Sequence, residues 1–197
     1  MRDPQSYLRY AVGETRSAAG SCSTDYPLSD IIISHELLLR TGQPDYLREK
    51  LALQDLAQHM SEQPSELLPR LVNLAMEACD SDSAGISVLR GDQFHWLGLQ
   101  GALKKFEGAT TPRNFSPCGV CLDELAPVLM ENPERQYGWI SEAGIVVPEV
   151  LLVPLMDGER ALGTLWVVAR EGQHFDAEHA RAVTELSKFA GIALRMI

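Results

Sequence analysis

The chain has 197 residues and a formal net charge of −10. This length allows one well-formed core with an extra arm, and it is too short for two ordinary domains. The 17 basic residues are scattered, so the chain lacks the clustered Lys and Arg that neutralise phosphates, which excludes DNA and RNA as direct partners.

The N-terminal residues do not have the pattern of a secretory signal. The start, MRDPQSYLRY, lacks the apolar stretch of a secretory signal, and no run in the chain reaches the ~18 apolar residues of a membrane span. The sequence thus predicts a cytoplasmic protein with no membrane partner. Residues 1–30 show little periodicity, which indicates a loosely ordered arm. We expect residues 1–43 to form this arm and a helix, and residues 44–197 to form the domain proper.

Two helices are expected at the start of the domain, separated at Gln63-Pro64. Apolar residues recur at helical spacing in both. In the first helix these are Leu53, Leu56, Ala57 and Met60, and in the second they are Leu68, Leu71, Val72, Ala75 and Cys79.

Two hairpins follow. Residues 84–89 alternate in polarity and turn at Arg90-Gly91-Asp92 into a second strand, residues 94–99. Residues 150–156 and 161–169 flank Asp157-Gly158, a hairpin signal because both residues can take positive φ. About fifty residues separate the hairpins and contain one short strand candidate, residues 127–130. Long segments of this kind inside a compact domain are usually functional.

A final helix begins at Asp176, whose side chain is a good N-cap. Apolar residues at 3-4-3-4 spacing form a seam for a helix partner, and a second apolar stripe lies beside it. These patterns predict a homodimer through the N-terminal helix and residues 176–197, although a broad face buried in one domain fits equally well. The seam is Val183, Leu186, Ala190, Ala193 and Ile197, and the second stripe is Ala182, Phe189, Ile192 and Met196.

The segment TTPRNFSPCGVCLDELAPVLM, residues 110–130, contains Ser116-Pro117-Cys118-Gly119. This tetrapeptide resembles the S-[FP]-C-[GA] signature of GAF domains, and the two hairpins and the acid-capped final helix occur in the order typical of that family. The resemblance covers roughly residues 45–197 and is closest to GAF modules upstream of bacterial sensor histidine kinases. It implies an α+β fold, with a central antiparallel sheet of about six strands. The terminal helices would cover one face, and a loop and short helix would cover a pocket on the other.

The resemblance also implies a function. GAF domains of this kind are non-catalytic sensory modules that bind a small molecule and signal through their terminal helices. The expected partners are therefore an unidentified small molecule, a second copy of the chain and a signalling protein. A pure interaction module, with a pocket filled by its own side chains, is a further possibility.

Eight residues are candidates for ligand contact. The resemblance places Ser116, Cys118 and Cys121 at the pocket helix. Aromatic side chains supply apolar pocket walls, and Arg113 is the best-placed cation for an anionic ligand, with a solvated loop charge as the alternative. The aromatic candidates are Trp96, Phe115, Tyr137 and Trp139. Trp166 lies on a central strand, but the sequence does not decide which face Trp96 or Trp166 occupies.

The pair Cys118 and Cys121 also allows a redox interpretation. Two thiols three residues apart at a helix start can share a proton and lower one pKa, as in thiol reductases and redox sensors. Thioredoxin-like pairs follow a strand directly, whereas this pair follows a loop, which favours packing cysteines. In a reducing compartment the four cysteines are expected to be thiols.

Other cofactor and enzyme classes fit poorly. A bilin is unlikely on motif grounds, because the chromophore cysteine of phytochrome-like GAF domains is followed by His, and here Gly119 and Leu122 follow the cysteines. The cysteine contexts of GAF domains that reduce free methionine sulfoxide also differ. No second C-x-x-C supports a metal site. The sequence around His35 resembles a kinase phosphoacceptor box, but no glycine-rich ATP-binding box follows.

Overall fold

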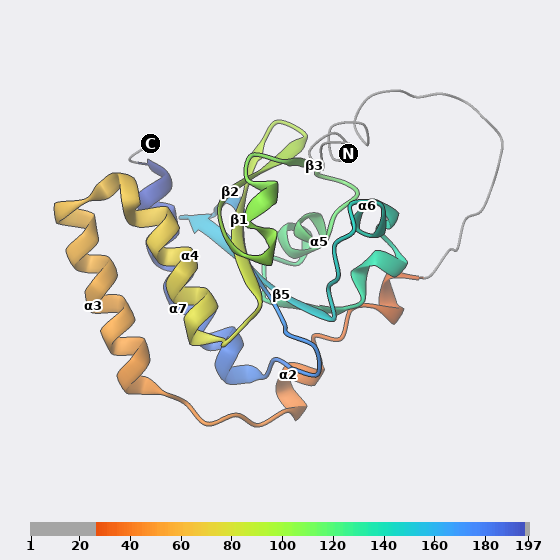
Figure 1. Cartoon of the computed structure of the whole chain (residues 1–197), viewed down its shortest axis with the longest axis horizontal. Coiled ribbons are helices and arrows are strands. Elements are labelled where there is room, and N and C mark those ends of the chain that lie inside the picture. Colours follow the sequence, from red (N-terminus) through yellow and green to blue (C-terminus); the bar gives the residue numbers. More distant parts are fainter. Residues whose placement is uncertain (1–26, 196–197) are drawn as a thin grey trace.

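A six-stranded antiparallel sheet with helices on both faces forms the centre of the computed structural model, which describes residues 27–195 (Figure 1). This confirms the α+β fold expected from the sequence. The strand order is β3-β2-β1-β6-β5-β4, and every neighbouring pair is antiparallel. The strands are β1 (Ser83–Arg90), β2 (Gln93–Gly101), β3 (Thr110–Pro112), β4 (Val128–Glu131), β5 (Glu149–Asp157) and β6 (Arg160–Val168).

The helices divide between the two faces of the sheet (Figure 1). The long helices α3 (Tyr46–Glu62), α4 (Leu67–Ala78) and α7 (Ala177–Arg195) lie on one side, and α5 (Pro117–Glu124) and α6 (Gly138–Glu142) lie on the other. Short helical pieces complete the chain: α2 (Glu36–Leu39), η1 (Leu28–Asp30), η2 (Pro64–Glu66), η3 (Ala102–Phe106) and η4 (Pro133–Arg135). Within residues 27–195, none of the helices has the length and apolar content to cross a membrane.

Strand alternation divides the apolar core into two clusters. Along β6, Leu165 and Val167 belong to the cluster under α4 and α7, which we call the helix-side cluster. Trp166 and Val168 belong to the cluster under α5 and α6, the pocket-side cluster. Trp96 of β2 is also in the pocket-side cluster. Both tryptophans therefore face the short helices, which the sequence left undecided.

The first hairpin turn lies within the predicted Arg90-Gly91-Asp92, and the second lies one residue later than the sequence indicated. Arg90 pairs with Gln93, so the first turn is Gly91-Asp92. Asp157 pairs with Arg160, so Asp157 ends a strand and the second turn is Gly158-Glu159. Gly158 has φ of +61°, and the turn needs positive φ at this first position only. The expectation that Asp157 is a central turn residue is therefore wrong.

The long segment between the hairpins holds two strands rather than one. The expected strand near residues 127–130 is β4, Val128–Glu131, and the unexpected one is β3, Thr110–Pro112. β3 has three residues, ends in proline and pairs with β2 at the sheet edge, where a missing N–H is tolerated.

The 3-4-3-4 seam of α7 is buried inside its own domain. Val183, Leu186, Ala190 and Ala193 belong to the helix-side cluster and pack between the sheet and α4. The prediction that these residues form a seam for a second chain is therefore wrong, because the sheet already covers them. In the second stripe Ala182, Phe189 and Ile192 are half-buried, and residues 196 and 197 lie outside the described residues.

Residues 27–45 form an N-terminal strap along the edge of the sheet. The Ile33 N–H donates to the Leu129 carbonyl (2.9 Å), and the Glu131 N–H donates to the Ile31 carbonyl (2.9 Å), so the strap pairs with β4. Further on, Arg40 Nη1 donates to both carboxylate oxygens of Glu149, at 2.9 and 3.0 Å. The predicted boundary near residue 44 stays a prediction, and most of the expected arm, residues 1–26, lies outside the described residues.

Glu149, at the start of β5, is 1% exposed. Besides Arg40, it accepts hydrogen bonds from the Phe175 N–H (3.0 Å) and is 2.6 Å from Nδ1 of His174. A buried carboxylate is tolerated only when it is paired and hydrogen-bonded. The strap therefore supplies the guanidinium that keeps this carboxylate inside the domain.

Candidate functional site

The short helix α5 covers the sheet as the sequence indicated. Ser116 is its N-cap, with Oγ accepting a hydrogen bond from the Gly119 N–H (3.2 Å), and Pro117 occupies the first turn, where no N–H is needed. The helix ends at Leu125, whose φ is +50°. A Cβ at Gly119 would overlap the Arg113 carbonyl oxygen. Glycine is thus needed for the incoming loop to pass this close to the helix.

Three tryptophans pack together between the sheet and the cover formed by α5 and α6: Trp96 and Trp166 lie on strands, and Trp139 lies on α6. The ring of Trp96 lies 5.7 Å from that of Trp166 and 6.0 Å from that of Trp139, with interplanar angles of 59° and 62°. Tilted contacts of this kind are favourable between aromatic rings. Trp166 also lies directly over Gly85 of β1, because a Cβ there would come within 2.7 Å of its Cη2. Glycine at this position leaves the space that the indole fills.

Each of these indole N–H groups has an acceptor. This matters because an unpaired buried N–H would cost about 1–3 kcal/mol. Two acceptors are hydroxyls on neighbouring strands and the third is a backbone carbonyl of the α5 loop. The bonds run from Trp166 to Ser87 Oγ (3.0 Å), from Trp96 to Thr111 Oγ1 (3.4 Å) and from Trp139 to the Phe115 carbonyl (3.2 Å).

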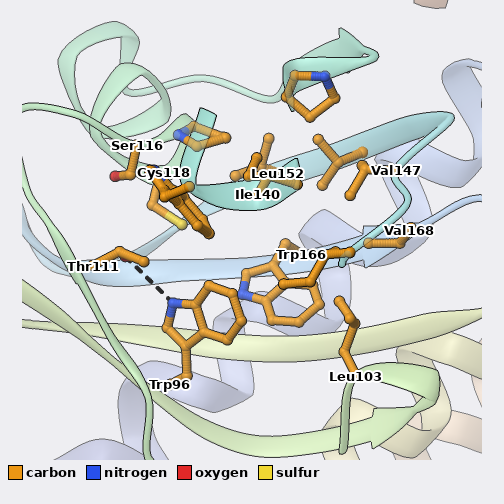
Figure 2. A pocket seen from close by; sticks show the side chains of 15 residues that line it. Trp96, Leu103, Thr111, Ser116, Cys118, Ile140, Val147, Leu152, Trp166 and Val168 are labelled. Atoms are coloured by element: carbon orange, nitrogen blue, oxygen red, sulfur yellow. Dashed lines mark hydrogen bonds between the residues drawn. The ribbon is translucent and has the colours of Figure 1, made fainter. Parts of the chain in front are cut away.

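A cavity of about 50 Å³ lies between the sheet and the cover (Figure 2). Its floor is the sheet, through Trp96, Leu152, Trp166 and Val168, and its roof comes from the covering segments. Apolar side chains dominate the lining, which is typical of small-molecule sites. The volume is well below the ~300–1,000 Å³ of pockets for drug-sized ligands. Most of the space expected for a ligand is occupied by the protein's own side chains.

Four of the eight predicted contact residues line this cavity. They are Trp96, Ser116, Cys118 and Trp139. The other four belong to its surroundings and are not among the lining residues: Arg113, Phe115, Cys121 and Tyr137.

Arg113 is engaged by the helix that it precedes. Its Nη2 lies 2.6 Å from Asp123 Oδ1, and its Nη1 donates to the Gly119 carbonyl (3.1 Å). The guanidinium therefore fixes α5 on its loop, and both of its terminal nitrogens already have oxygen partners. These contacts explain why Arg113, which the sequence predicted as a ligand contact, is not among the residues that line the cavity.

Phe115 and Tyr137 form a second aromatic contact outside the cavity. Phe115 is 45% exposed, and its ring lies 5.3 Å from that of Tyr137 in an edge arrangement. Burial raises the pKa of Tyr137 to about 12, so its hydroxyl is neutral at physiological pH. The pair joins the start of α5 to the start of α6 and so closes the cover from outside.

The two cysteines of the C-x-x-C pair are buried free thiols. Burial raises the pKa of Cys118, and the hydroxyls of Ser87 and Thr164 only partly oppose this effect. Burial likewise raises the pKa of Cys121, whose Sγ donates to the Ala126 carbonyl (3.5 Å). The spacing suggested a lowered pKa, but the folded environment shifts both thiols in the opposite direction. Neither is a ready nucleophile at neutral pH.

No group of three His, Cys, Asp or Glu side chains in residues 27–195 is arranged to hold a metal. His35, from the phosphoacceptor-like sequence, is the residue before α2 and its side chain is 67% exposed next to Glu36.

Several lining residues were not predicted from the sequence. Trp166 was an aromatic candidate whose face the sequence left open, and Val168 follows from alternation on β6 once Trp166 is placed in the pocket. Leu103, Ile145 and Val147 come from segments without periodicity, so no local signal distinguishes them from other apolar loop residues.

Comparison with known proteins agrees with the fold. The family model of the GAF domain matches residues 61–195. Among curated proteins, no match is found. The GAF domain of a phosphoenolpyruvate-protein phosphotransferase from Coxiella burnetii is 17% identical, with a TM-score of 0.68 over 77% of this chain and 95% of that one.

Two further structures have similar folds. The free methionine-R-sulfoxide reductase from Neisseria meningitidis, in complex with its substrate, is 18% identical, with a TM-score of 0.63 over 79% of this chain and 94% of that one. The GAF-B domain of DevS from Mycobacterium smegmatis is 18% identical, with a TM-score of 0.56 over 68% of this chain and 94% of that one. At these identities the likeness concerns the fold.

Proposed function

The chain belongs to the GAF domain family, and on this basis we propose that it is a non-catalytic regulatory domain. It binds a small molecule between the sheet and the α5–α6 cover and signals through its terminal helices to a partner protein. A partner of the two-component class and a cytoplasmic location are parts of the same proposal. They rest on the resemblance to modules upstream of sensor histidine kinases.

The observation that carries the proposal is the apolar cavity beneath α5. It lies on the sheet face that the family resemblance assigns to the ligand, and Cys118 and Ser116 of the signature line it. Because its volume is about 50 Å³, a ligand of ordinary size must displace part of the cover or rotate a tryptophan. Ligand binding would therefore be coupled to a change in the packing of the cover or of the tryptophans, and such a coupling allows a ligand to shift the population between two states.

The sheet offers a direct path from the cavity to the terminal helices. On β5, Val150 and Leu152 line the cavity, whereas Leu151 and Val153 on the opposite face belong to the helix-side cluster. The helix α7 packs on β5. Movement of β5 when the cavity opens would therefore alter the packing of α7, and this coupling is the physical basis of the proposed signal.

Self-association remains part of the proposal, but it must use another surface than the α7 seam. Helix α3 exposes large apolar side chains, with Tyr46 66%, Leu47 68% and Leu51 56% exposed. Contiguous exposed apolar side chains often mark interfaces. We expect a homodimer through α3, to be tested by sedimentation of the wild type and of Leu47→Glu/Leu51→Glu, which should be monomeric.

A thiol-based redox sensor or reductase using Cys118 and Cys121 is the alternative. One neighbour by fold is itself a reductase, and the two cysteines lie on one short helix. The raised pKa values oppose this function, because exchange requires a thiolate. Mass spectrometry after mild oxidation separates the two: a reversible Cys118–Cys121 disulfide supports redox use, and two unmodified thiols support the regulatory domain.

The main test is small-molecule binding with a cavity-filling control. Native mass spectrometry of the purified chain should detect a retained small molecule, and a thermal-shift screen of metabolites should find ligands that raise the unfolding temperature. Val147→Phe adds a ring at the cavity wall and should abolish both effects. Leu39→Phe, at a position 69% exposed on α2, is the matched surface control and should bind normally.

Equal binding by wild type and Val147→Phe would place the ligand elsewhere. A chain that retains nothing and responds to no metabolite would favour the pure interaction module, in which the tryptophans permanently fill the pocket.

A further inference from the structure

A second hollow adjoins the inner cavity. An open cleft of about 570 Å³ lies between η3, the loop before β5 and the segment after β6. Leu103 and Ile145 line both this outer cleft and the inner cavity. They are only 8% and 6% exposed and belong to the pocket-side cluster. Side chains that line two hollows at once lie between them, so these two residues form the partition.

The two hollows differ in chemistry. The inner cavity has apolar walls that include three indole rings. The outer cleft carries Lys105 and Arg170 together with Asp82 and Glu171, so both signs of charge are present. Arg170 is already 3.0 Å from Asp80. A cleft with balanced charges does not select a strongly anionic molecule, but it solvates and hydrogen-bonds an uncharged or zwitterionic polar group.

We infer that Leu103 and Ile145 gate a two-compartment ligand site, which rests on the proposed small-molecule function. The ligand class is a small uncharged or zwitterionic molecule with one compact apolar end. The apolar end passes the gate into the inner cavity, and the polar end stays in the outer cleft. Since the inner cavity has a volume of only about 50 Å³, the apolar end must be compact unless the cover moves.

The backbone on both sides of the gate has glycines with positive φ. Leu103 is in η3, which is preceded by Gly101 (φ +74°), and Ile145 follows Gly144 (φ +66°). Leu103 lies in a short 3-10 helix and Ile145 lies in a loop, so neither gate residue belongs to the sheet. Movement of these segments opens the partition without breaking the ladder of β1, β6 and β5.

The chain provides its own reporter. It contains three tryptophans, and all three line the inner cavity, so its intrinsic fluorescence reports on this site. Quenching by acrylamide measures how easily a small polar molecule reaches the cavity, and quenching by xenon measures whether the cavity admits an apolar guest.

Leu103→Ala and Ile145→Ala should each raise the acrylamide quenching constant severalfold. Two matched controls should stay near wild type: Val168→Ala, which enlarges only the inner cavity, and Val146→Ala, at a 79% exposed position that lines only the outer cleft. Leu103→Phe should lower quenching. Gate variants that quench like the wild type would overturn the gate. Ile145→Ala and Leu103→Phe keep the test decisive if Leu103→Ala unfolds.

Xenon distinguishes failure of the gate from failure of the proposed function. If xenon quenches the wild type but the gate variants do not change acrylamide quenching, the proposed cavity stands and only the gate is overturned. No xenon quenching in the wild type or in Leu103→Ala would overturn both, because the cavity would then exclude even a small apolar guest.

The size limit has its own test by NMR of the indole N–H signals. 1-Propanol, with a compact apolar end and a hydroxyl, should shift these signals in the wild type. Benzyl alcohol should shift them only in Leu103→Ala. Equal shifts by benzyl alcohol in the wild type and the variant would overturn the limit on the apolar end.

Discussion

Substituting Gly85 by alanine tests whether Trp166 rests on the backbone of β1. The new Cβ would lie 2.7 Å from Cη2 of Trp166 and closer still to Cζ2, so the ring must retreat by about 1 Å to reach the ~3.5 Å optimum for carbon contacts. Overpacking of this kind costs about 1–3 kcal/mol. Loss of the 3.0 Å bond from Trp166 to Ser87 adds about 1 kcal/mol, and reduced entropy of the unfolded chain returns about 0.4–1 kcal/mol.

The net expectation is a loss of about 1–3 kcal/mol in the free energy of unfolding, measured by urea denaturation. For a chain of this size each kcal/mol lowers the midpoint temperature by about 2–4 °C. The emission spectrum should change too, because Trp166 is one of three fluorophores in one cluster. Gly138→Ala is the matched control, since a Cβ there meets nothing within 4 Å. If both variants behave alike in stability and emission, Trp166 does not rest on Gly85.

Three further predictions concern the turn, the strap and the thiols. Gly158→Val should cost about 1–3 kcal/mol through strain at φ +61°, and an unchanged urea midpoint would show that the turn lies elsewhere. Arg40→Ala should cost about 3 kcal/mol because Glu149 would stay buried without its guanidinium; Glu149→Gln, which keeps a polar group for the Phe175 N–H, should cost less, and the reverse order would refute this role. Because burial raises the pKa of Cys118 and Cys121, the thiols stabilise the fold below their unfolded pKa of about 8.5 and this contribution is lost at higher pH. Between about pH 8 and pH 10, the free energy of unfolding should therefore decrease less in the double variant Cys118→Ala/Cys121→Ala than in the wild type. Identical pH profiles of the two proteins would contradict the raised pKa values.

Local chemistry explains which parts of the fold were predictable from the sequence. The start of α5 depends on Ser116 as N-cap and Pro117 in the first turn, and both act within a few residues of themselves. The hairpins follow from alternation within each strand. By contrast, the turn at Gly158-Glu159 is fixed by the pairing of Asp157 with Arg160. That pairing depends on the register of the whole ladder, which a dipeptide signal cannot report.

The candidate site shows the same limit. Cys118 and Trp139 were found because a signature and an aromatic side chain are visible in the sequence. The direction of the cysteine pKa shift and the engagement of Arg113 with Asp123 were not, because both depend on neighbours brought by folding. Short β3 was missed because its three residues pair with β2 from across a loop. Tertiary contacts thus decide what a local pattern leaves open.

The N-terminal strap has a consequence for the reach of helix α3. Residues 40–45 join the buried Arg40–Glu149 contact to the first turn of α3, and six residues span at most about 20 Å when fully extended. Helix α3 is therefore tethered, through this short length of chain, to the end of β5 that adjoins the cavity wall. Any rearrangement that moves α3 farther than this length of chain allows must first break the contact between Arg40 and Glu149. The buried carboxylate of Glu149 would then lose its guanidinium partner. The strap thereby sets a mechanical limit on how far the N-terminal helix can travel while the domain stays folded.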